Sequence, residues 1–334
     1  MVLFFHGDFL FMNIQFHLTN SCNLRCKHCY QGAYNPEHIS LEQFNLVMRK
    51  TCDFFASIGD PVYTLLLTGG EPLCVPAFED YLFSANQFCE KLSIMSNGTL
   101  LTEENLFRFK HADKFFRVQV SLEGPEPIND SIRGIGTFKK IRRAIRLIKD
   151  AGLRCTVSCT LAPYNYDKVD VLYADLISHD SPDVLWFDRC IPFKGTGLLT
   201  KEQFAEFIHI LSILRRRYLS EHLPVIPSAG RALQWLSEPD KSHGYCCAAG
   251  LGHFTIMHNG DVMICRRLDF AVGNLLKEEW SDIMERAVPI MEKIHSLPDD
   301  CADCQYAHFC NGGLKCLTYS QFHDFNRKDV NCLC

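Results

Sequence analysis

The sequence lacks an excess of basic residues, a long apolar run and an export signal. Its 334 residues include 34 Lys and Arg against 39 Asp and Glu, so the formal net charge is −5. This balance gives no electrostatic footprint for nucleic acid. The apolar start of the chain has no basic region and no cleavage site, and it is too short for a membrane span. We therefore expect a cytoplasmic protein that binds neither nucleic acid nor membranes, with Met1 or Met12 as its natural start.

The composition is that of an ordinary globular protein except for its cysteine content. Apolar residues make up 47% and charged residues 22% of the chain, which is enough material for one large domain or two. The 18 cysteines are many for a reducing compartment, where disulfides are rare. They therefore favour metal or cluster binding over disulfide bridges.

Three cysteines lie close together directly after a strand-like run over residues 13–19. Cys22, Cys26 and Cys29 have the spacing Cys-x3-Cys-x2-Cys, in which thiolates are soft ligands that one loop can wrap around a metal centre. A structural zinc site and an all-cysteine cubane each need four protein ligands, so three leave one position open for a small molecule. The alternatives are a zinc site completed by His28 or a distant residue, or three buried free thiols.

Strand-like apolar runs alternate with amphipathic stretches as far as about residue 200. Parallel strands need crossover connections, so six such units in series predict an α/β fold with a parallel sheet and helices outside it. Six units are too few for a closed eight-stranded barrel, and we expect a curved partial barrel that binds ligands at the carboxyl ends of its strands. The expected strands are 13–19, 63–68, 91–96, 117–122, 154–161 and 183–188, and the expected helices are 41–57, 77–90, 103–111, 138–151, 166–179 and 201–219.

Glycines and polar residues follow the second and third expected strands. Gly69 and Gly70 permit a close approach of the backbone, and Glu71 offers a carboxylate to a cationic group. As an isolated pattern, these three residues are also common in ordinary turns between a strand and a helix. Ser96 and Asn97 have side chains that suit either ribose hydroxyls or turn formation.

Charged residues follow the fourth and sixth strands. Ser121 and Glu123 end the fourth strand, and Arg133 lies shortly after it; a guanidinium there suits a carboxylate, which it can bind bidentately. Asp188 and Arg189 place charge at the barrel mouth, either to hold a substrate or as part of a structural ion pair.

The last third of the chain has a different pattern, in which the alternation stops and cysteines become frequent. Residues 253–258 and 261–266 flank Asn259–Gly260, a strong signal for a two-residue hairpin. Cys247 precedes this hairpin and Cys265 lies in its second strand. Two structural zinc sites are one interpretation, because loop-rich cysteine clusters often bind zinc. The remaining cysteines of this part are Cys301, Cys304, Cys310, Cys316, Cys332 and Cys334.

From Asn13 to Cys334 these motifs together resemble the radical SAM enzymes, and the C-terminal cysteines resemble their SPASM extension. In that superfamily three loop cysteines hold a [4Fe–4S] cluster whose fourth iron binds S-adenosylmethionine (SAM), and SPASM members carry two auxiliary [4Fe–4S] clusters. The resemblance implies a partial (β/α)6 TIM-like barrel over residues 1–222, followed by a SPASM-type iron–sulfur domain over residues 223–334. It also implies reductive cleavage of SAM to a 5′-deoxyadenosyl radical, which abstracts a hydrogen atom from the substrate.

The resemblance also assigns roles to the barrel residues. Cys22, Cys26 and Cys29 would hold the SAM cluster. SAM itself would be positioned by Tyr30, Gly69, Gly70, Glu71, Ser96, Asn97, Ser121 and Arg133. Candidate substrate contacts are Glu123, Asp188 and Arg189, although the peptide-modifying members more often have aspartate where Glu123 stands.

The C-terminal cysteines would bind two auxiliary clusters, which accept the substrate electron or bind substrate sulfur. Three of them, Cys247, Cys265 and Cys316, would serve the first cluster, with Cys246 the nearest candidate for a fourth ligand. The second cluster would be held by Cys301, Cys304, Cys310 and Cys332, with Cys334 competing with Cys332. The chain departs from the family in having five residues between Cys310 and Cys316, where three are usual.

SPASM enzymes most often modify ribosomally made peptides, and the resemblance therefore implies a radical SAM oxidoreductase that oxidises or crosslinks a peptide residue. Because no winged-helix leader-recognition domain is expected, a separate recognition protein or direct recognition of a short peptide is implied, with an external electron donor of the flavodoxin or ferredoxin type. The alternatives are oxidation of a sulfatase Cys or Ser, radical dehydrogenation of a small molecule such as an amino sugar, and a zinc-stapled binding protein without catalysis.

Overall fold

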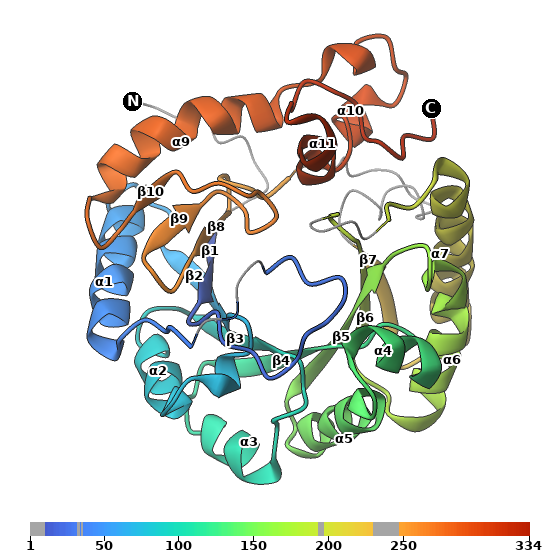
Figure 1. The fold of residues 1–334 in the computed structure, drawn as a ribbon, viewed down its shortest axis with the longest axis horizontal. Helices are drawn as coiled ribbons and strands as arrows, with labels where there is room; N and C mark the ends of the chain where they lie inside the picture. The colour runs from blue at the N-terminus through green and yellow to red at the C-terminus, as the bar shows by residue number, and fades with distance from the viewer. Residues whose placement is uncertain (1–10, 32–33, 35, 193–196, 230–246) are drawn as a thin grey trace.

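A curved sheet of parallel strands, with helices around its outer side, carries the described part of the chain, as Figure 1 shows. The computed structural model describes residues 11–31, 34, 36–192, 197–229 and 247–334. The strand order is β10-β9-β8-β1-β2-β3-β4-β5-β6-β7. The strands are β1 (Met12–His17), β2 (Val62–Thr68), β3 (Lys91–Ser96), β4 (Phe115–Ser121), β5 (Arg154–Leu161), β6 (Val184–Arg189), β7 (Ile226–Ala229), β8 (His253–Ile256), β9 (Asp261–Met263) and β10 (Gly273–Asn274).

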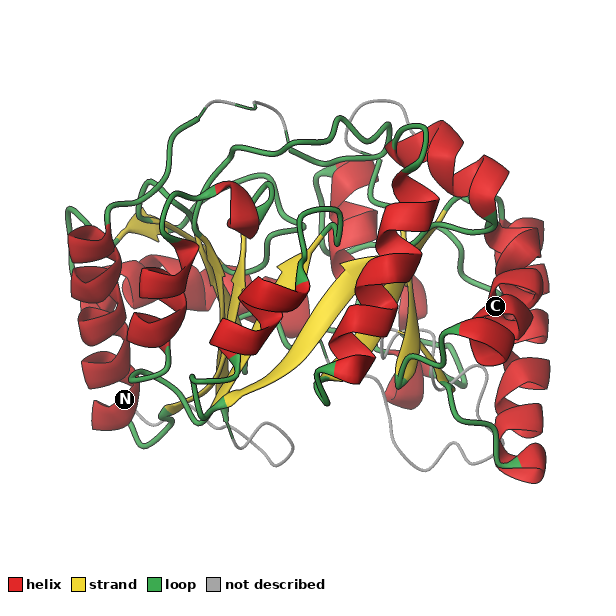
Figure 2. Cartoon of the chain, turned by 90° about the horizontal axis from the view of Figure 1, so that it is seen from below, coloured by secondary structure: helices red, strands yellow, loops and turns green. Residues whose placement is uncertain are grey.

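The sheet is parallel from β8 through β1 to β7, and only β8, β9 and β10 pair antiparallel. Figure 2 shows the strands enclosed between helices. The helices are α1 (Leu41–Ser57), α2 (Phe78–Ala85), α3 (Glu103–Phe109), α4 (Glu126–Arg133), α5 (Thr137–Asp150), α6 (Val169–His179), α7 (Lys201–Glu221), α9 (Trp280–His295), α10 (Ala307–Cys310) and α11 (Lys315–Phe322).

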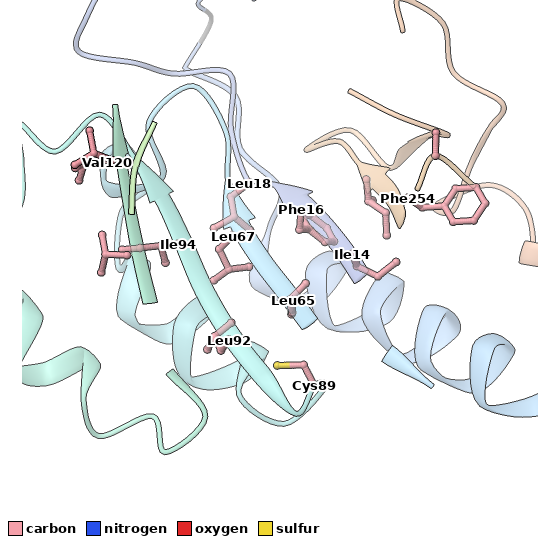
Figure 3. Packing of buried hydrophobic residues seen from close by; sticks show 14 of the residues in the cluster. Ile14, Phe16, Leu18, Leu65, Leu67, Cys89, Leu92, Ile94, Val120 and Phe254 are labelled. Carbon is pink, nitrogen blue, oxygen red and sulfur yellow. The ribbon is translucent and has the colours of Figure 1, made fainter. Parts of the chain in front are cut away.

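Side chains alternate between the two faces of β1 and thereby separate the core from the concave face. Ile14 and Phe16 are fully buried toward the helical layer, and Figure 3 shows them beside Leu65 of β2. Asn13 and Gln15 are half-buried and point to the opposite, concave face because successive strand residues alternate. The concave face therefore begins with polar groups, which a polar ligand requires.

Helix starts in the barrel follow from local sequence. The Ser40 hydroxyl accepts a hydrogen bond from the Gln43 amide, and the Gln43 side chain reaches back, which caps α1. Thr200 and Gln203 do the same for α7. These capping boxes explain why both helices begin at the residues predicted from the sequence.

The C-terminal region is attached to the barrel through α1. The indole of Trp280, at the start of α9, donates a hydrogen bond of 3.0 Å to the Thr51 hydroxyl and lies against the rings of Phe54 and Phe55. Trp280 is fully buried, and an aromatic of this size contributes strongly to a core.

The predicted partial barrel is confirmed, and each of the six predicted strands is observed with ends that differ by at most two residues. The structure also contains elements that the sequence pattern did not indicate, among them α9, β7 and α4. β7 continues the parallel sheet beyond α7, although it has four residues and contains Pro227. α4 begins at Glu126 with a proline in its first turn. The division at residues 222 and 223 stays a prediction, and β7 lies beyond it.

Candidate functional site

The loop after β1 carries Cys22, Cys26 and Cys29, and it crosses the centre of the strand ring in Figure 1. All three cysteines are half-buried. The Leu24 amide donates to the Cys22 Sγ at 3.4 Å, and the Gln31 amide donates to the Cys29 Sγ at 3.5 Å. Amide donors of this kind suit sulfur atoms that carry negative charge, as cluster ligands do.

The three thiols lie near enough to one another that the charge of one affects the pKa of the next. Burial raises the pKa of Cys22, and the neighbouring Glu71 and Cys29 raise it further. Burial also raises the pKa of Cys26, where Arg133 acts in the opposite direction and Cys29 and Cys22 add to the rise. A bound metal deprotonates a coordinating thiol outright. Three half-buried soft donors on one loop therefore fit an iron–sulfur cluster with an open position.

The glycines after β2 bring the cysteine loop onto the sheet. The Gly70 amide donates to the Thr19 carbonyl at 2.7 Å, and the Glu71 amide donates to the Ser21 carbonyl at 2.8 Å. A Cβ on Gly69 would lie 2.6 Å from the Thr19 oxygen, and one on Gly70 would lie 2.3 Å from the Ser21 oxygen. The close approach expected of these glycines is present, and the partner is the protein's own cysteine loop.

The Glu71 carboxylate connects the ends of β2 and β3. It accepts hydrogen bonds from the Ser96 hydroxyl at 2.8 Å, the Asn97 amide at 2.6 Å and the Leu73 amide at 3.2 Å. Complete burial raises the pKa of Glu71 to about 7 although these donors favour the charged form. Because the protein itself supplies these partners, the carboxylate orders the loops, and its contact with a cationic ligand stays a prediction.

Ser96 and Asn97 are also engaged within the protein. The Ser96 hydroxyl accepts from the Gly98 amide at 3.0 Å in addition to its bond to Glu71. The Asn97 side-chain amide donates to the Asn23 side chain at 2.8 Å and faces the Cys22 Sγ at 3.9 Å. In this structure Asn97 therefore links β3 to the cysteine loop, and the contact of either residue with a ribose stays a prediction.

Glu123 and Arg133 form a buried ion pair beside the loop. Arg133 Nε donates to Glu123 Oε1 at 3.0 Å, and its Nη1 faces the Cys26 Sγ at 3.8 Å. The other carboxylate oxygen of Glu123 accepts from the Thr160 amide at 2.7 Å, and His28 Nε2 lies 3.4 Å from the first. Burial opposes ionisation of Glu123, but Arg133 and His28 outweigh it and hold its pKa at about 2.

Both residues have partners within the protein, and their expected roles toward substrate and SAM stay predictions. Glu123 was expected to contact substrate, yet its side chain is fully buried between protein groups. The Arg133 guanidinium has one edge on Glu123 and the Nη1 group toward Cys26. Ser121 is half-buried at the carboxyl end of β4, where its role toward SAM stays a prediction.

Asp188 and Arg189, at the end of β6, each form an ion pair with the C-terminal region. Asp188 accepts from Arg267 Nη1 at 2.8 Å. Arg189 donates to Asp329 at 2.7 and 2.6 Å and to the Asn331 side chain at 3.0 Å. Of the two interpretations of these residues, the structure supports the structural ion pair, and a substrate contact stays a prediction.

Two further groups of thiols lie in the C-terminal region. Burial raises the pKa of Cys316, and Cys265 and Cys247 lie near enough to raise it too. Burial likewise raises the pKa of Cys265 to about 11, with Cys247 as the next contributor. The three cysteines expected at the first auxiliary cluster are therefore near enough to affect one another's pKa, and their role as ligands stays a prediction. Cys246, the candidate fourth ligand, lies outside the described residues.

The second group surrounds a pocket. Its lining includes Cys301, Cys304, Cys310, Cys332 and Cys334, so one more thiol is present than a cubane needs. Cys332 is half-buried, whereas Cys334 is exposed and close enough to Cys304 and Cys332 for their sulfurs to raise its pKa after burial. Within the described residues no three His, Cys, Asp or Glu side chains are arranged to hold a single metal ion.

The structure places three further residues at these sites; Tyr30 is predicted to position SAM, whereas the sequence patterns gave no role to Cys74 or Lys315. Cys74 lies near Cys22, whose charge contributes to the raised pKa of the Cys74 thiol after burial. Lys315 is buried, and its ammonium group donates to the Ser296 carbonyl at 3.0 Å between the two C-terminal thiol groups. Tyr30 lies under the guanidinium of Arg266, 4.4 Å from the ring centre. Of these residues, Lys315 could have been found from the sequence as a neighbour of a cluster ligand, because it directly precedes Cys316.

Comparison with protein-family models gives two matches along the chain. The model of the radical SAM superfamily matches residues 16–176, which include the cysteine loop and most of the barrel. The model of SPASM, an iron–sulfur cluster-binding domain, matches residues 246–305. None of the helices in the described part has the length and apolar character that a membrane span needs.

Relatives and solved structures match most of the chain at low identity. An AdoMet-dependent heme synthase of Oleidesulfovibrio alaskensis is 24% identical, covering 90% of this chain and 81% of its own length. The subtilosin biosynthesis protein AlbA of Bacillus subtilis is 26% identical, covering 94% and 70%. The solved structure of anSMEcpe with bound AdoMet and a Cp18Cys peptide has a TM-score of 0.77 at 20% identity, covering 96% and 93%. This last likeness concerns the fold.

Proposed function

Because the chain carries a radical SAM domain followed by a SPASM iron–sulfur domain, and so belongs to the SPASM group of radical SAM enzymes, we propose that it oxidises or crosslinks a residue of a ribosomally made peptide. The observation that carries this proposal is the position of Cys22, Cys26 and Cys29. The backbone bonds of Gly70 and Glu71 hold their loop at the carboxyl ends of the strands, where ligands of such folds bind.

In this proposal Cys22, Cys26 and Cys29 would hold a [4Fe–4S] cluster that leaves one iron open for SAM. When bound, this cluster would supply the electron for reductive cleavage of SAM and hence for hydrogen-atom abstraction from the substrate. An external donor of the flavodoxin or ferredoxin type delivers that electron.

The chain's own residues order the site and supply charge. The hydrogen bonds of Glu71, Ser96 and Asn97 connect the cysteine loop to the ends of β2 and β3. Arg133 Nη1 faces Cys26 and is the cation that we assign to the SAM carboxylate. Glu123 holds that guanidinium in place from its other edge.

We also propose two auxiliary [4Fe–4S] clusters. Cys247, Cys265 and Cys316 lie near one another and would serve the first. The pocket cysteines Cys301, Cys304, Cys310 and Cys332 would serve the second. Buried Lys315 lies near cysteines of both groups, where its positive charge would favour the reduced, more negative state of each cluster.

The choice of a peptide substrate rests on what the relatives' names say of those proteins. AlbA is named for the biosynthesis of a bacteriocin, and anSMEcpe was solved with a bound peptide. A second candidate is a tetrapyrrole, since a relative named as a heme synthase matches 90% of the chain. Oxidation of a sulfatase Cys or Ser stays an alternative to the peptide reaction.

Product analysis of the reconstituted enzyme tests the proposal. The enzyme is incubated without oxygen with SAM, a reductant and a pool of short peptides encoded by the source genome, in parallel with coproporphyrin III. We expect one peptide to lose two hydrogens as 5′-deoxyadenosine forms, and no change with the Cys26→Ala variant. Modification of the tetrapyrrole alone would overturn the peptide proposal.

A further inference from the structure

Arg266 is a cation that has no carboxylate partner within the part of the chain that the structure describes. It directly follows Cys265, and its guanidinium carbon lies 4.4 Å from the centre of the Tyr30 ring. Tyr30 directly follows Cys29, so Arg266 lies where the cysteine loop meets the C-terminal hairpin. Its Nε is buried and makes no hydrogen bond to a described residue. Among the described residues, this guanidinium therefore has no acceptor for its Nε–H.

The neighbouring arginine shows the contrast. Arg267 forms a bidentate ion pair with Asp188, with one bond of 2.8 Å, so its charge is neutralised inside the protein. A buried donor without a partner costs free energy, and a guanidinium has five N–H donors to satisfy. The stacking of Arg266 on Tyr30 attracts the cation, but the ring face offers no acceptor atom for the N–H groups.

Two buried histidines lie in this region, and no ion pair joins Arg266 to a carboxylate of the described residues. His17 is 2% exposed, and burial followed by the charge of Arg266 lowers its pKa well below its usual range. Burial and then Arg267 lower the pKa of His253 to about 4. Both imidazoles are therefore neutral near pH 7, and their Nε2 atoms lie 3.0 Å from the Gln15 side chain and 3.3 Å from the Thr255 hydroxyl. Glu37, an exposed side chain, has its carboxylate 3.7 Å from His258 Nε2.

We propose that Arg266 binds a carboxylate of the substrate between the cysteine loop and the hairpin. This inference rests on the proposed function, because it names a chemical property of the substrate of that reaction. Arg133 already places a cation beside Cys26 for the carboxylate of SAM, so a second anion is needed to explain Arg266. An acidic peptide residue and a tetrapyrrole acid share this chemistry.

Competitive binding measures the preference for a carboxylate directly. Reconstituted enzyme with SAM is mixed with one pool of blocked random hexapeptides, in which a fixed central position is Asp, Glu, Asn or Gln and no other acid occurs. Bound peptides are counted by mass spectrometry, and coproporphyrin III is compared with its tetra-amide by calorimetry. We expect the wild type to prefer acids over amides by about 10- to 100-fold in at least one arm, as for a hydrogen bond to a charged group.

Variants separate this role from a structural one. The preference should fall to about one in Arg266→Gln, be partly kept in Arg266→Lys, and stay unchanged in Arg267→Lys, which keeps a cation for Asp188. Only variants with wild-type iron content are compared. Equal binding of acids and amides by the wild type in both arms would overturn the inference, as would a loss of SAM affinity in Arg266→Gln with the preference intact.

The outcomes distinguish this inference from the proposed function. A clear acid preference without any modified peptide would leave Arg266 as the carboxylate site and remove the peptide reaction. Peptide modification without an acid preference would support the proposed function and overturn the assignment of Arg266 as the carboxylate site.

Discussion

Arg189 of β6 and Asp329 near the end of the chain form a buried bidentate ion pair, with N–O distances of 2.7 and 2.6 Å. Asp329 also accepts from the Leu314 amide at 2.7 Å and borders the pocket lined by five cysteines. The pair therefore ties the carboxyl end of a barrel strand to the second C-terminal thiol group. A substitution at Arg189 is therefore expected to disturb the loop that carries Asp329, and with it the pocket lined by the five cysteines.

Removing the cation of this pair should destabilise the protein strongly. In Arg189→Met the carboxylate of Asp329 stays buried without its partner, and we expect a loss of about 3–5 kcal/mol in the free energy of unfolding. Urea unfolding measures this loss. The matched control is Arg327→Met, which breaks an exposed ion pair with Asp300 and should cost less than about 1 kcal/mol. Equal losses in the two variants would contradict the role given to Arg189.

Gly70→Ala should separate the cysteine loop from the sheet. Its Cβ would lie 2.3 Å from the Ser21 oxygen, so the bond from the Glu71 amide to that oxygen has to lengthen or break. We expect iron content to fall by about four per chain, the content of one cubane. Gly197→Ala is the control, since among the described residues its Cβ would meet Pro163 at 3.5 Å, an ordinary van der Waals distance. Unchanged iron in Gly70→Ala would show that the loop does not need this contact.

Glu123 should make stability depend on pH in the acid range. Its pKa is lowered from 4.5 to about 2 by Arg133 and His28 against the opposing effect of burial. Its contribution is therefore fully present above about pH 4.5 and lost as the pH falls through about 2, and it amounts to about 3 kcal/mol. The stability difference between wild type and Glu123→Gln should be largest at pH 7 and less than half as large near pH 2.5.

The control for this prediction is Glu104→Gln, which changes an exposed carboxylate paired with Arg108. Its stability difference from the wild type should stay small at every pH. A constant difference for Glu123→Gln across the same range would show that the carboxylate is not held ionised by its neighbours.

Cys332 and Cys334 should differ as ligands although both line the same pocket. Cys332 is half-buried beside Cys301 and Cys310, whereas Cys334 is exposed. We expect Cys332→Ala to lose about four irons per chain and Cys334→Ala to keep them. Iron and sulfide analysis checks this, with Cys52→Ala as the control away from the thiol groups. The reverse result would assign the ligand to Cys334.

The fold was predictable where the chain alternates between buried strands and capped helices. The run Arg154–Leu161 and the helix Leu41–Ser57 were both expected with their observed ends, because apolar periodicity and a capping box define them. β7 was missed because four residues with a proline carry little periodic signal. Its position depends on pairing with β6, which is a tertiary interaction.

The sequence predicted which residues belong to the site, but it did not predict which residues they contact. The spacing of Cys22, Cys26 and Cys29 placed three thiols on one loop, and the structure brings them together. The partners of Glu71 and Glu123 were not predictable, since their donors come from residues 25 and 37 positions away along the chain. Local sequence carries no information on which of two neighbouring arginines, Arg266 or Arg267, finds a carboxylate.

The measurement that tests the central claim most directly is metal and sulfide content after anaerobic reconstitution, with SAM cleavage assayed beside it. The account predicts about twelve irons per chain in the wild type and about eight in the Cys22→Ala/Cys26→Ala/Cys29→Ala variant, with 5′-deoxyadenosine formed only by the wild type. Zinc in place of iron, with SAM left intact by the wild type, would contradict it.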